Sequence, residues 1–163
     1  MNLTPAQKSL LERVVNVFET GKPDGDYGLI AIFHDGPHNI RQITYGRSQT
    51  TEYGKLRQLV QAYVAANGIF SAALRRYADD VGSKPLTDNE DFKNLLRRAG
   101  REDVVMRRVQ DKFFDDAYFR PAMKWADQVL HERALLALVL EGEVAIVFDA
   151  AGEMRFVEVR RAR

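Results

Sequence analysis

Two carboxylates near the start of the chain could act together in acid–base chemistry. Glu19 comes at the end of a predicted helix, and Asp35 lies in a short polar loop between two apolar runs. Cleavage of a glycosidic bond needs such a pair, because one carboxyl group protonates the leaving sugar oxygen and the other activates a water or stabilises the oxocarbenium ion. We therefore expect the two carboxylates to face each other across a cleft, about 6.5–9.5 Å apart if a water fits between them.

The helix that carries Glu19 is predicted from its own start and stop signals. Thr4 can cap the helix, Gln7 completes a possible capping box, and Gly21 supplies the stop. Its apolar face consists of Leu10, Leu11, Val14, Val15 and Phe18. Glu19 continues this row at the C-terminal end, where the macrodipole disfavours an anion, and both effects would raise the pKa of its carboxyl group. A raised pKa suits a general acid, although a glutamate in the last turn can also be an ordinary surface residue.

The loop that carries Asp35 joins two predicted strands, residues 29–33 and 40–45. Gly36-Pro37 is a turn signal, so Asp35 could also be a turn aspartate that bonds its own backbone. His34 and His38 have a spacing that would suit a metal site on a helix. Because a turn separates them here, we expect polar loop histidines, with no metal site and no cofactor.

Helical periodicity predicts most of the remaining chain. The expected helices are residues 52–66, residues 70–80, a short helix capped by Thr87 or Asp88 and ending at Gly100, a stretch from about residue 102 that Pro121 breaks or restarts, and residues 122–140. Residues 144–148 and 154–159 predict a C-terminal β-hairpin, which must dock on another part of the chain or another chain to be stable. We therefore predict one mainly helical α+β domain over residues 1–163, with a small β-element beside the cleft.

Composition narrows the possible functions. The chain of 163 residues is 45% hydrophobic and 29% charged, which is typical of a globular domain. A formal net charge of +1 gives no general case for binding nucleic acid or an anionic membrane, and the absence of cysteine excludes disulfides and thiolate chemistry. Residues 1–20 lack an apolar signal-peptide core, and no apolar run approaches membrane-spanning length.

Several ordered blocks resemble the family 46 glycoside hydrolases, the chitosanases of the lysozyme superfamily. The matching blocks are Phe18-Glu19, Asp35-Gly36, Thr44-Tyr45-Gly46, Leu59–Tyr63 and Tyr118–Ala122. Residues 43–54 are also similar to a bacterial subgroup of chitosanase-like or peptidoglycan-associated proteins. The resemblance covers about residues 3–128, and residues 129–163 depart from the family, whose further helices complete a second lobe. It implies a lysozyme-like fold and an inverting hydrolysis of β-1,4-linked glucosamine polymers.

The resemblance also implies roles for individual residues. The family's general acid falls on Glu19, and its water-positioning threonine falls on Thr44. The family's general base precedes that threonine by five residues, which is Asn39 here, and an amide cannot act as a base. We therefore assign the base to Asp35, which requires an insertion of residues 37–40, because loops absorb insertions more easily than chemistry absorbs a lost carboxylate. If Asp35 lies far from Glu19, the next carboxylate to consider is Glu52, the first one after the second strand.

Four further residues are expected to bind substrate or to orient the carboxylates: Arg41, Tyr45, Arg47 and Glu52. The predicted partner is therefore a polysaccharide, chitosan or alternatively peptidoglycan, with no nucleic acid and no membrane, and the oligomeric state is left open. A non-catalytic carbohydrate-binding remnant is a third possibility, since the second lobe departs from the family. The family is extracellular, whereas no signal peptide is visible, so a cytoplasmic location stays open.

Overall fold

The structure is a computed structural model that describes residues 3–129, 136–139, 144–148 and 154–158. The chain groups into two compact units, residues 13–113 and residues 1–12 with 114–163. Whether the two units form one domain, as the sequence predicts, depends on how they join. The single domain therefore stays a prediction. Among the described residues, no helix is both long and apolar enough to cross a membrane.

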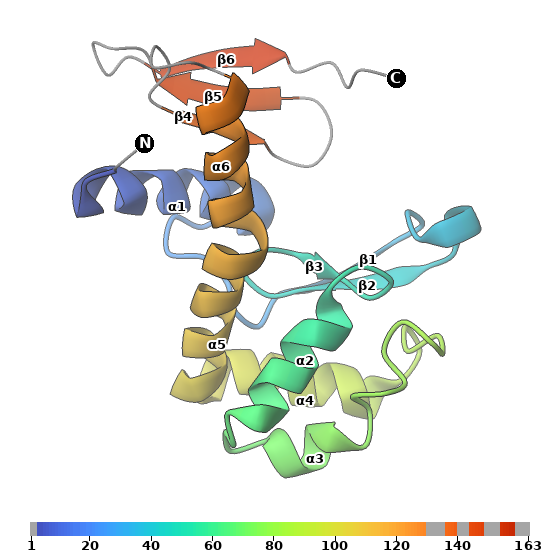
Figure 1. The fold of residues 1–163 in the computed structure, drawn as a ribbon. Helices are drawn as coiled ribbons and strands as arrows, with labels where there is room; N and C mark the ends of the chain where they lie inside the picture. Colours follow the sequence, from blue (N-terminus) through green and yellow to red (C-terminus); the bar gives the residue numbers. More distant parts are fainter. Residues whose placement is uncertain (1–2, 130–135, 140–143, 149–153, 159–163) are drawn as a thin grey trace. The chain divides into compact units, whose positions relative to one another are not determined.

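Helix α1, Pro5–Thr20, begins and ends where its residues predict (Figure 1). The capping box is formed, because the Gln7 backbone N–H donates to Thr4 Oγ1 at 3.3 Å and the Thr4 N–H donates to Gln7 Oε1 at 2.9 Å. At the other end, the Gly21 N–H donates to the Val17 carbonyl at 2.9 Å. Gly21 has a φ of 71°, a conformation that glycine adopts without steric cost and that ends the helix.

A three-stranded antiparallel sheet follows α1, with the order β1-β2-β3. Its strands are β1 (Ile30–Phe33), β2 (Gln42–Tyr45) and β3 (Thr50–Thr51). The first two confirm the predicted strands to within two residues, whereas β3 lies in a stretch for which the sequence predicted no element.

The sheet has two faces of different character. Ile30 pairs with Tyr45 and Ile32 pairs with Ile43, and all four belong to or pack against the hydrophobic core. Because side chains alternate along a strand, the other face carries Ala31, Phe33, Gln42 and Thr44. We call this second side of the sheet the non-core face.

The helices that pack on the core face come next in the sequence. They are α2 (Leu56–Ala65), α3 (Ser71–Arg75), α4 (Glu90–Glu102) and α5 (Val104–Phe114). In Figure 1, α2 and α4 lie below the sheet, whereas the C-terminal part of α1 lies above it. Fully buried Leu56, Tyr63 and Leu96 come from two of these helices and join the sheet residues in one core. Burial of such apolar side chains is the main stabilising contribution to a domain of this size.

Four helix boundaries differ from the prediction. The helix predicted over residues 52–66 begins only at Leu56, after a stretch of turns. The N-cap of α4 is Asn89, whose side chain accepts the Phe92 N–H at 3.0 Å, so neither Thr87 nor Asp88 is the cap. α4 continues beyond Gly100 to Glu102. The helix predicted over residues 70–80 ends at Arg75, and the rest of that stretch forms turns.

Buried Asp103 connects α4 to the turn between α2 and α3. Its Oδ2 atom accepts the Tyr63 hydroxyl at 2.5 Å and the Ile69 N–H at 2.7 Å, and its Oδ1 atom accepts the Val105 N–H at 2.8 Å. Burial by itself would raise the pKa of Asp103, but these hydrogen bonds outweigh it and hold the pKa below its usual range. The ionised carboxylate is therefore a structural element of this unit.

The other unit contains the C-terminal elements. A π-helical segment, Asp115–Phe119, is followed by α6 (Arg120–Val129) and by an antiparallel sheet of β4 (Leu136–Val139), β5 (Val144–Phe148) and β6 (Met154–Glu158). The predicted hairpin is thus confirmed as β5 and β6, while its turn lies outside the described residues. The helix predicted over residues 122–140 is wrong for 136–139, because these residues pair with β5 as a third strand. The irregularity expected at Pro121 is the π-helical segment before α6.

We expect Asp103→Asn to lower the free energy of unfolding in a pH-dependent way. A lowered pKa means that the carboxylate stabilises the fold above its unfolded pKa, about 3.9, and that this contribution is lost as the pH falls through the folded value. Urea unfolding should therefore show a large difference between the two proteins at pH 7 that narrows at pH 3. The exposed Asp79→Asn serves as the control, and an equal difference at both pH values would contradict the assigned role.

Candidate active site

Glu19 lies where the sequence predicts, next to the last residue of α1, and its side chain is partly buried. The sharp turn at Gly21 directs the chain away from the helix immediately afterwards. The predicted raised pKa of its carboxyl group and its role as an acid stay predictions.

Asp35 is exposed and is held by one neighbour on β2. Gln42 Nε2 donates to Asp35 Oδ1 at 3.0 Å, while Gln42 Oε1 accepts the Tyr53 N–H at 3.2 Å. The second contact fixes which way the Gln42 amide points, so its NH₂ group faces the carboxylate. Gln42 was missed by the sequence analysis, although it lies two residues before Thr44 and therefore on the same side of β2.

Residues 37–40 belong to the loop between β1 and β2, which is closed by its own backbone hydrogen bonds. Backbone hydrogen bonds join the Gly36 N–H to the Ile40 carbonyl at 3.1 Å and the Asn39 N–H to the Gly36 carbonyl at 3.0 Å. The short 3-10 helix Pro37–Asn39 forms the tip of this loop. The loop therefore closes on itself directly after Asp35, and the insertion of residues 37–40 relative to the family stays a prediction.

Thr44 lies on the non-core face and is buried. Its hydroxyl donates to Gln49 Oε1 at 2.7 Å, and Gln49 Nε2 donates to the Gly46 carbonyl at 2.9 Å. The second bond orients the Gln49 amide, so the threonine proton is already engaged. Toward a water molecule, Thr44 Oγ1 can therefore act only as a hydrogen-bond acceptor.

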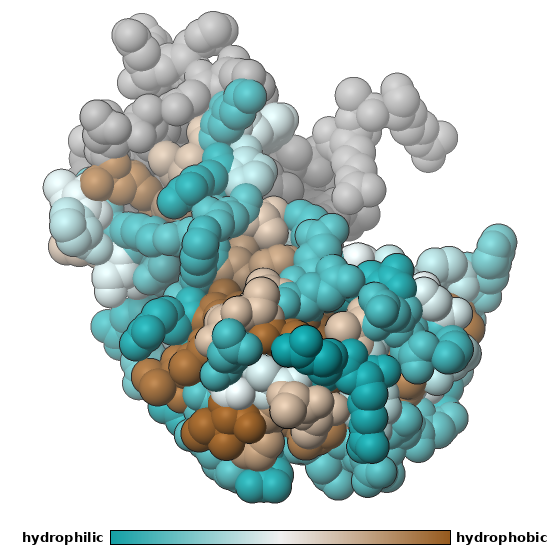
Figure 2. Space-filling view, turned by 60° about the horizontal axis from the view of Figure 1, so that its bottom comes forward, coloured by the Kyte–Doolittle hydropathy of each residue, from teal (hydrophilic) through white to brown (hydrophobic). Residues whose placement is uncertain are grey.

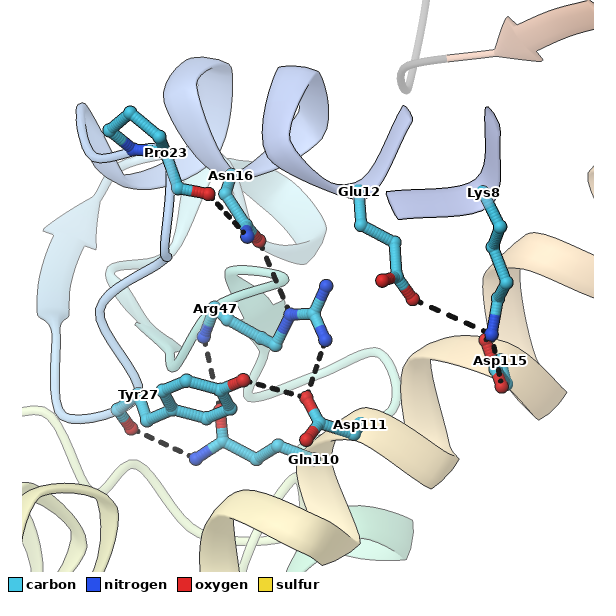
Figure 3. A network of polar contacts seen from close by, with 9 residues as sticks. All are labelled: Lys8, Glu12, Asn16, Pro23, Tyr27, Arg47, Gln110, Asp111 and Asp115. Carbon is cyan, nitrogen blue, oxygen red and sulfur yellow. Dashed lines mark hydrogen bonds and ion pairs between the residues drawn. The ribbon is translucent and has the colours of Figure 1, made fainter. Parts of the chain in front are cut away.

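Arg47 is almost fully buried and joins three parts of this unit (Figure 3). Its guanidinium bonds Asp111 Oδ1 of α5 at 2.5 Å and Asn16 Oδ1 of α1 at 3.2 Å. Its backbone N–H donates to Gln110 Oε1 at 3.1 Å, and the Tyr27 hydroxyl donates to the same Asp111 oxygen at 2.8 Å. Burying a guanidinium is costly unless it is paired and hydrogen-bonded in this way.

This network places α1 relative to the sheet. Asn16 lies one turn before Glu19 on α1, and it also donates through Nδ2 to the Pro23 carbonyl at 3.0 Å. Gly46, just before Arg47, has a φ of 77°, and a Cβ there would collide with the Gln110 amide. Arg47 therefore fixes the helix end that carries Glu19 rather than offering its charge to a ligand at the surface.

The other predicted substrate-binding residues lie in different surroundings. Tyr45 is fully buried, and its hydroxyl donates to the Leu96 carbonyl at 2.7 Å, so it belongs to the core and offers no surface to a sugar. Arg41 is exposed and pairs with exposed Asp88 at 3.2 Å, a type of contact that contributes little.

Glu52 is also part of the interior. Its carboxylate accepts the Ile43 N–H at 3.1 Å and the Leu86 N–H at 2.7 Å. Burial raises the pKa of Glu52, and these two hydrogen bonds offset only part of that effect. The residue connects β2 to the segment before α4, and this role replaces the substrate contact that the sequence suggested.

The structure thus brings together Asp35 and Gln42, and Gln42 and Thr44 lie on the same face of β2. That Glu19 faces Asp35 across a cleft stays a prediction. Within the described part of the chain, no group of three or more His, Cys, Asp or Glu side chains is placed to hold a metal ion. A separate open pocket of about 440 Å³ involves Lys22, Asp26 and Arg101, and none of the proposed catalytic residues lines it.

The chain is similar in sequence and fold to a segment of the family 46 chitosanases. It is 29% identical over 144 residues to the chitosanase of Bacillus subtilis (strain 168). It also resembles the GH46 chitosanase of Gynuella sunshinyii in complex with chitotetraose, with 25% identity, 81% of this chain covered and a TM-score of 0.66. A chitosanase from Bacillus subtilis MY002, solved as a glutamate-to-alanine mutant with 6 GlcN, gives 27% identity, the same coverage of this chain and a TM-score of 0.64. These similarities confirm the predicted resemblance and the lysozyme-like α+β fold.

The similarity covers only part of the relatives. The matched region spans 85% of this chain but 50% of the curated chitosanase, and it spans 55% of each of the two solved chains. No family model matches the chain. The chain therefore corresponds to about half of the length of the proteins it resembles.

We expect Arg47→Met to lower the free energy of unfolding by about 1–3 kcal/mol, because polar partners in a buried network lose their donor. Methionine keeps an unbranched side chain of similar reach, so the loss reports mainly on the guanidinium contacts. Urea unfolding is the measurement, and Arg98→Met is the control, since Arg98 pairs with Glu102 in an exposed position. Equal effects of the two substitutions would contradict the structural role of Arg47.

Proposed function

We propose that this protein is a glycoside hydrolase that cleaves the β-1,4 bonds of chitosan with inversion at the anomeric carbon. The similarity to family 46 chitosanases over most of this chain is the observation that carries the proposal. The positions of Glu19 and Asp35 support it, because a helix end and the loop after β1 supply the two carboxylates that inverting hydrolysis requires.

In the proposed reaction, Glu19 donates its proton to the glycosidic oxygen as the bond from that oxygen to the anomeric carbon breaks. Asp35 accepts a proton from a water whose oxygen forms the new bond to the anomeric carbon on the opposite face of the ring. One proton therefore leaves Glu19 and one arrives at Asp35, and the two carboxyl groups are restored by exchange with solvent. No cofactor is needed for this step.

Thr44 and Gln42 prepare the base side of the site in this proposal. A water that donates one proton to Thr44 Oγ1, which can only accept, has its other proton available for Asp35. Gln42 donates to Asp35 Oδ1 and so holds one carboxylate oxygen in place. A fixed carboxylate and a fixed water reduce the entropy cost of reaching the transition state.

We expect Glu19→Gln and Asp35→Asn each to reduce the release of reducing ends from chitosan by about 10²–10⁴-fold, because each removes one proton transfer. Both variants should unfold like the wild type in urea. The matched controls are Glu102→Gln, which changes the last residue of another helix, and Asp79→Asn on the surface.

The same proteins should be tested on peptidoglycan. Activity on peptidoglycan with none on chitosan would contradict the proposed substrate, and Glu19→Gln with more than about one per cent of wild-type activity would contradict the acid role. An anomeric analysis of the first products by NMR tests inversion, since retention would require a covalent intermediate instead.

Thr44→Val removes the hydroxyl of Thr44 but keeps the shape of its side chain, so it tests the role of the hydroxyl alone. Valine preserves the branched side chain in the sheet, but it offers no acceptor to a water, so we expect kcat on chitosan to fall by at least about tenfold while KM changes little. Thr51→Val provides the control, because Thr51 is the cross-strand partner of Thr44. Equal rates for wild type and Thr44→Val would contradict the proposed water contact.

A further inference from the structure

Phe33 is an exposed aromatic residue on the side of the sheet that carries the proposed base. Its exposed fraction is 53%, and it is the last residue of β1. The antiparallel register places it directly opposite Gln42, whose amide holds Asp35. Residues opposite each other in a ladder project to the same face, with Cβ atoms about 5 Å apart.

The exposure of Phe33 is unusual for its strand, because the other large apolar residues of β1 pack against the core. Ile30 and Ile32 of the same strand point to the core and are packed against it. A phenylalanine on the other face is not needed for that core, and leaving it half exposed forgoes part of the stabilisation that its burial would give. Gln42 and Thr44 beside it on β2 are buried, so the ring stands at the edge of a polar site.

We propose that the ring of Phe33 is a stacking platform for a glucosamine unit of the substrate, next to the unit whose bond is cleaved. This inference rests on the proposed function and adds a binding residue to it. The apolar faces of a sugar ring pack on an aromatic face, and a protonated amino group of glucosamine is attracted by the negative potential of the same ring. The Asp35 carboxylate nearby adds a favourable charge for a cationic sugar.

Phe18, beside Glu19, is also exposed, at 57%, whereas some other apolar side chains reach the surface without such a setting. Figure 2 shows apolar residues among hydrophilic ones on one face of the molecule. Ile69 has an exposed fraction of 74% and Val104 of 65%, and both flank Asp103. Single exposed residues of this kind are normal, and neither is aromatic or adjacent to Asp35, so Ile69 is a suitable control position.

The test measures binding of a glucosamine hexamer by calorimetry in the Glu19→Gln background, in which hydrolysis is slow. Adding Phe33→Ala should weaken binding by about two- to tenfold, the range that an aromatic contact contributes, whereas Phe33→Trp should preserve or improve it. Ile69→Ala should leave binding unchanged. In the otherwise wild-type enzyme, Phe33→Ala should raise KM for chitosan with kcat retained, as loss of uniform binding does.

The outcomes separate this inference from the proposed function. Unchanged binding by Phe33→Ala, or an equal loss in Ile69→Ala, would overturn the stacking role while leaving the hydrolase proposal intact. If the parent protein binds no hexamer and releases no reducing ends, the proposed function itself fails. Thermal unfolding of each variant confirms that a change in binding is not a change in folding.

Discussion

The buried guanidinium of Arg47 is the constraint on which the candidate site depends. It lies in the turn between β2 and β3, and it bonds Asn16 of α1 and Asp111 of α5. A charged group at 4% exposure is tolerated only because these partners replace its lost hydration. Any movement of the end of α1 away from the sheet would break part of this network, so the position of Glu19 is tied to that of β2.

The sheet then divides structural and chemical roles between its two faces. Ile43 and Tyr45 alternate with Gln42 and Thr44 along one short strand. One pair anchors the strand in the core, and the Tyr45 hydroxyl and the Glu52 carboxylate add fixed hydrogen bonds on that side. Gln42 and Thr44 can therefore be held rigidly although they face a polar site, because the core contacts on the opposite face fix the backbone of β2.

Local signals predicted α1 and the first two strands well. The capping box at Thr4 and Gln7 and the stop at Gly21 depend only on neighbouring residues, and they are formed as expected. Because side chains alternate along β2, Tyr45 must point to the same face as Ile43. The sequence pattern therefore already places Tyr45 in the core and not against a substrate.

Other features were not visible in local patterns. Asn16 and Asp111 are 31 and 64 residues from Arg47 in the sequence, and neither partner follows from spacing or composition. The helix expected over residues 122–140 failed at residues 136–139 for a similar reason. A short apolar run is compatible with a helix or a strand, and pairing with β5 decides between them.

Gln42 and Gln49 determine which atoms around Asp35 and Thr44 donate hydrogen bonds and which accept them. The Gln42 amide is oriented by the Tyr53 N–H, and the Gln49 amide is oriented by the Gly46 carbonyl. One therefore presents donors to Asp35, and the other presents an acceptor to Thr44. If a water enters between Asp35 and Thr44, both neighbours can only accept its protons, and its lone pairs are left to face the substrate. In the proposed hydrolysis, this polarity selects the orientation in which the water oxygen attacks, and it is set by neutral amides before any proton moves.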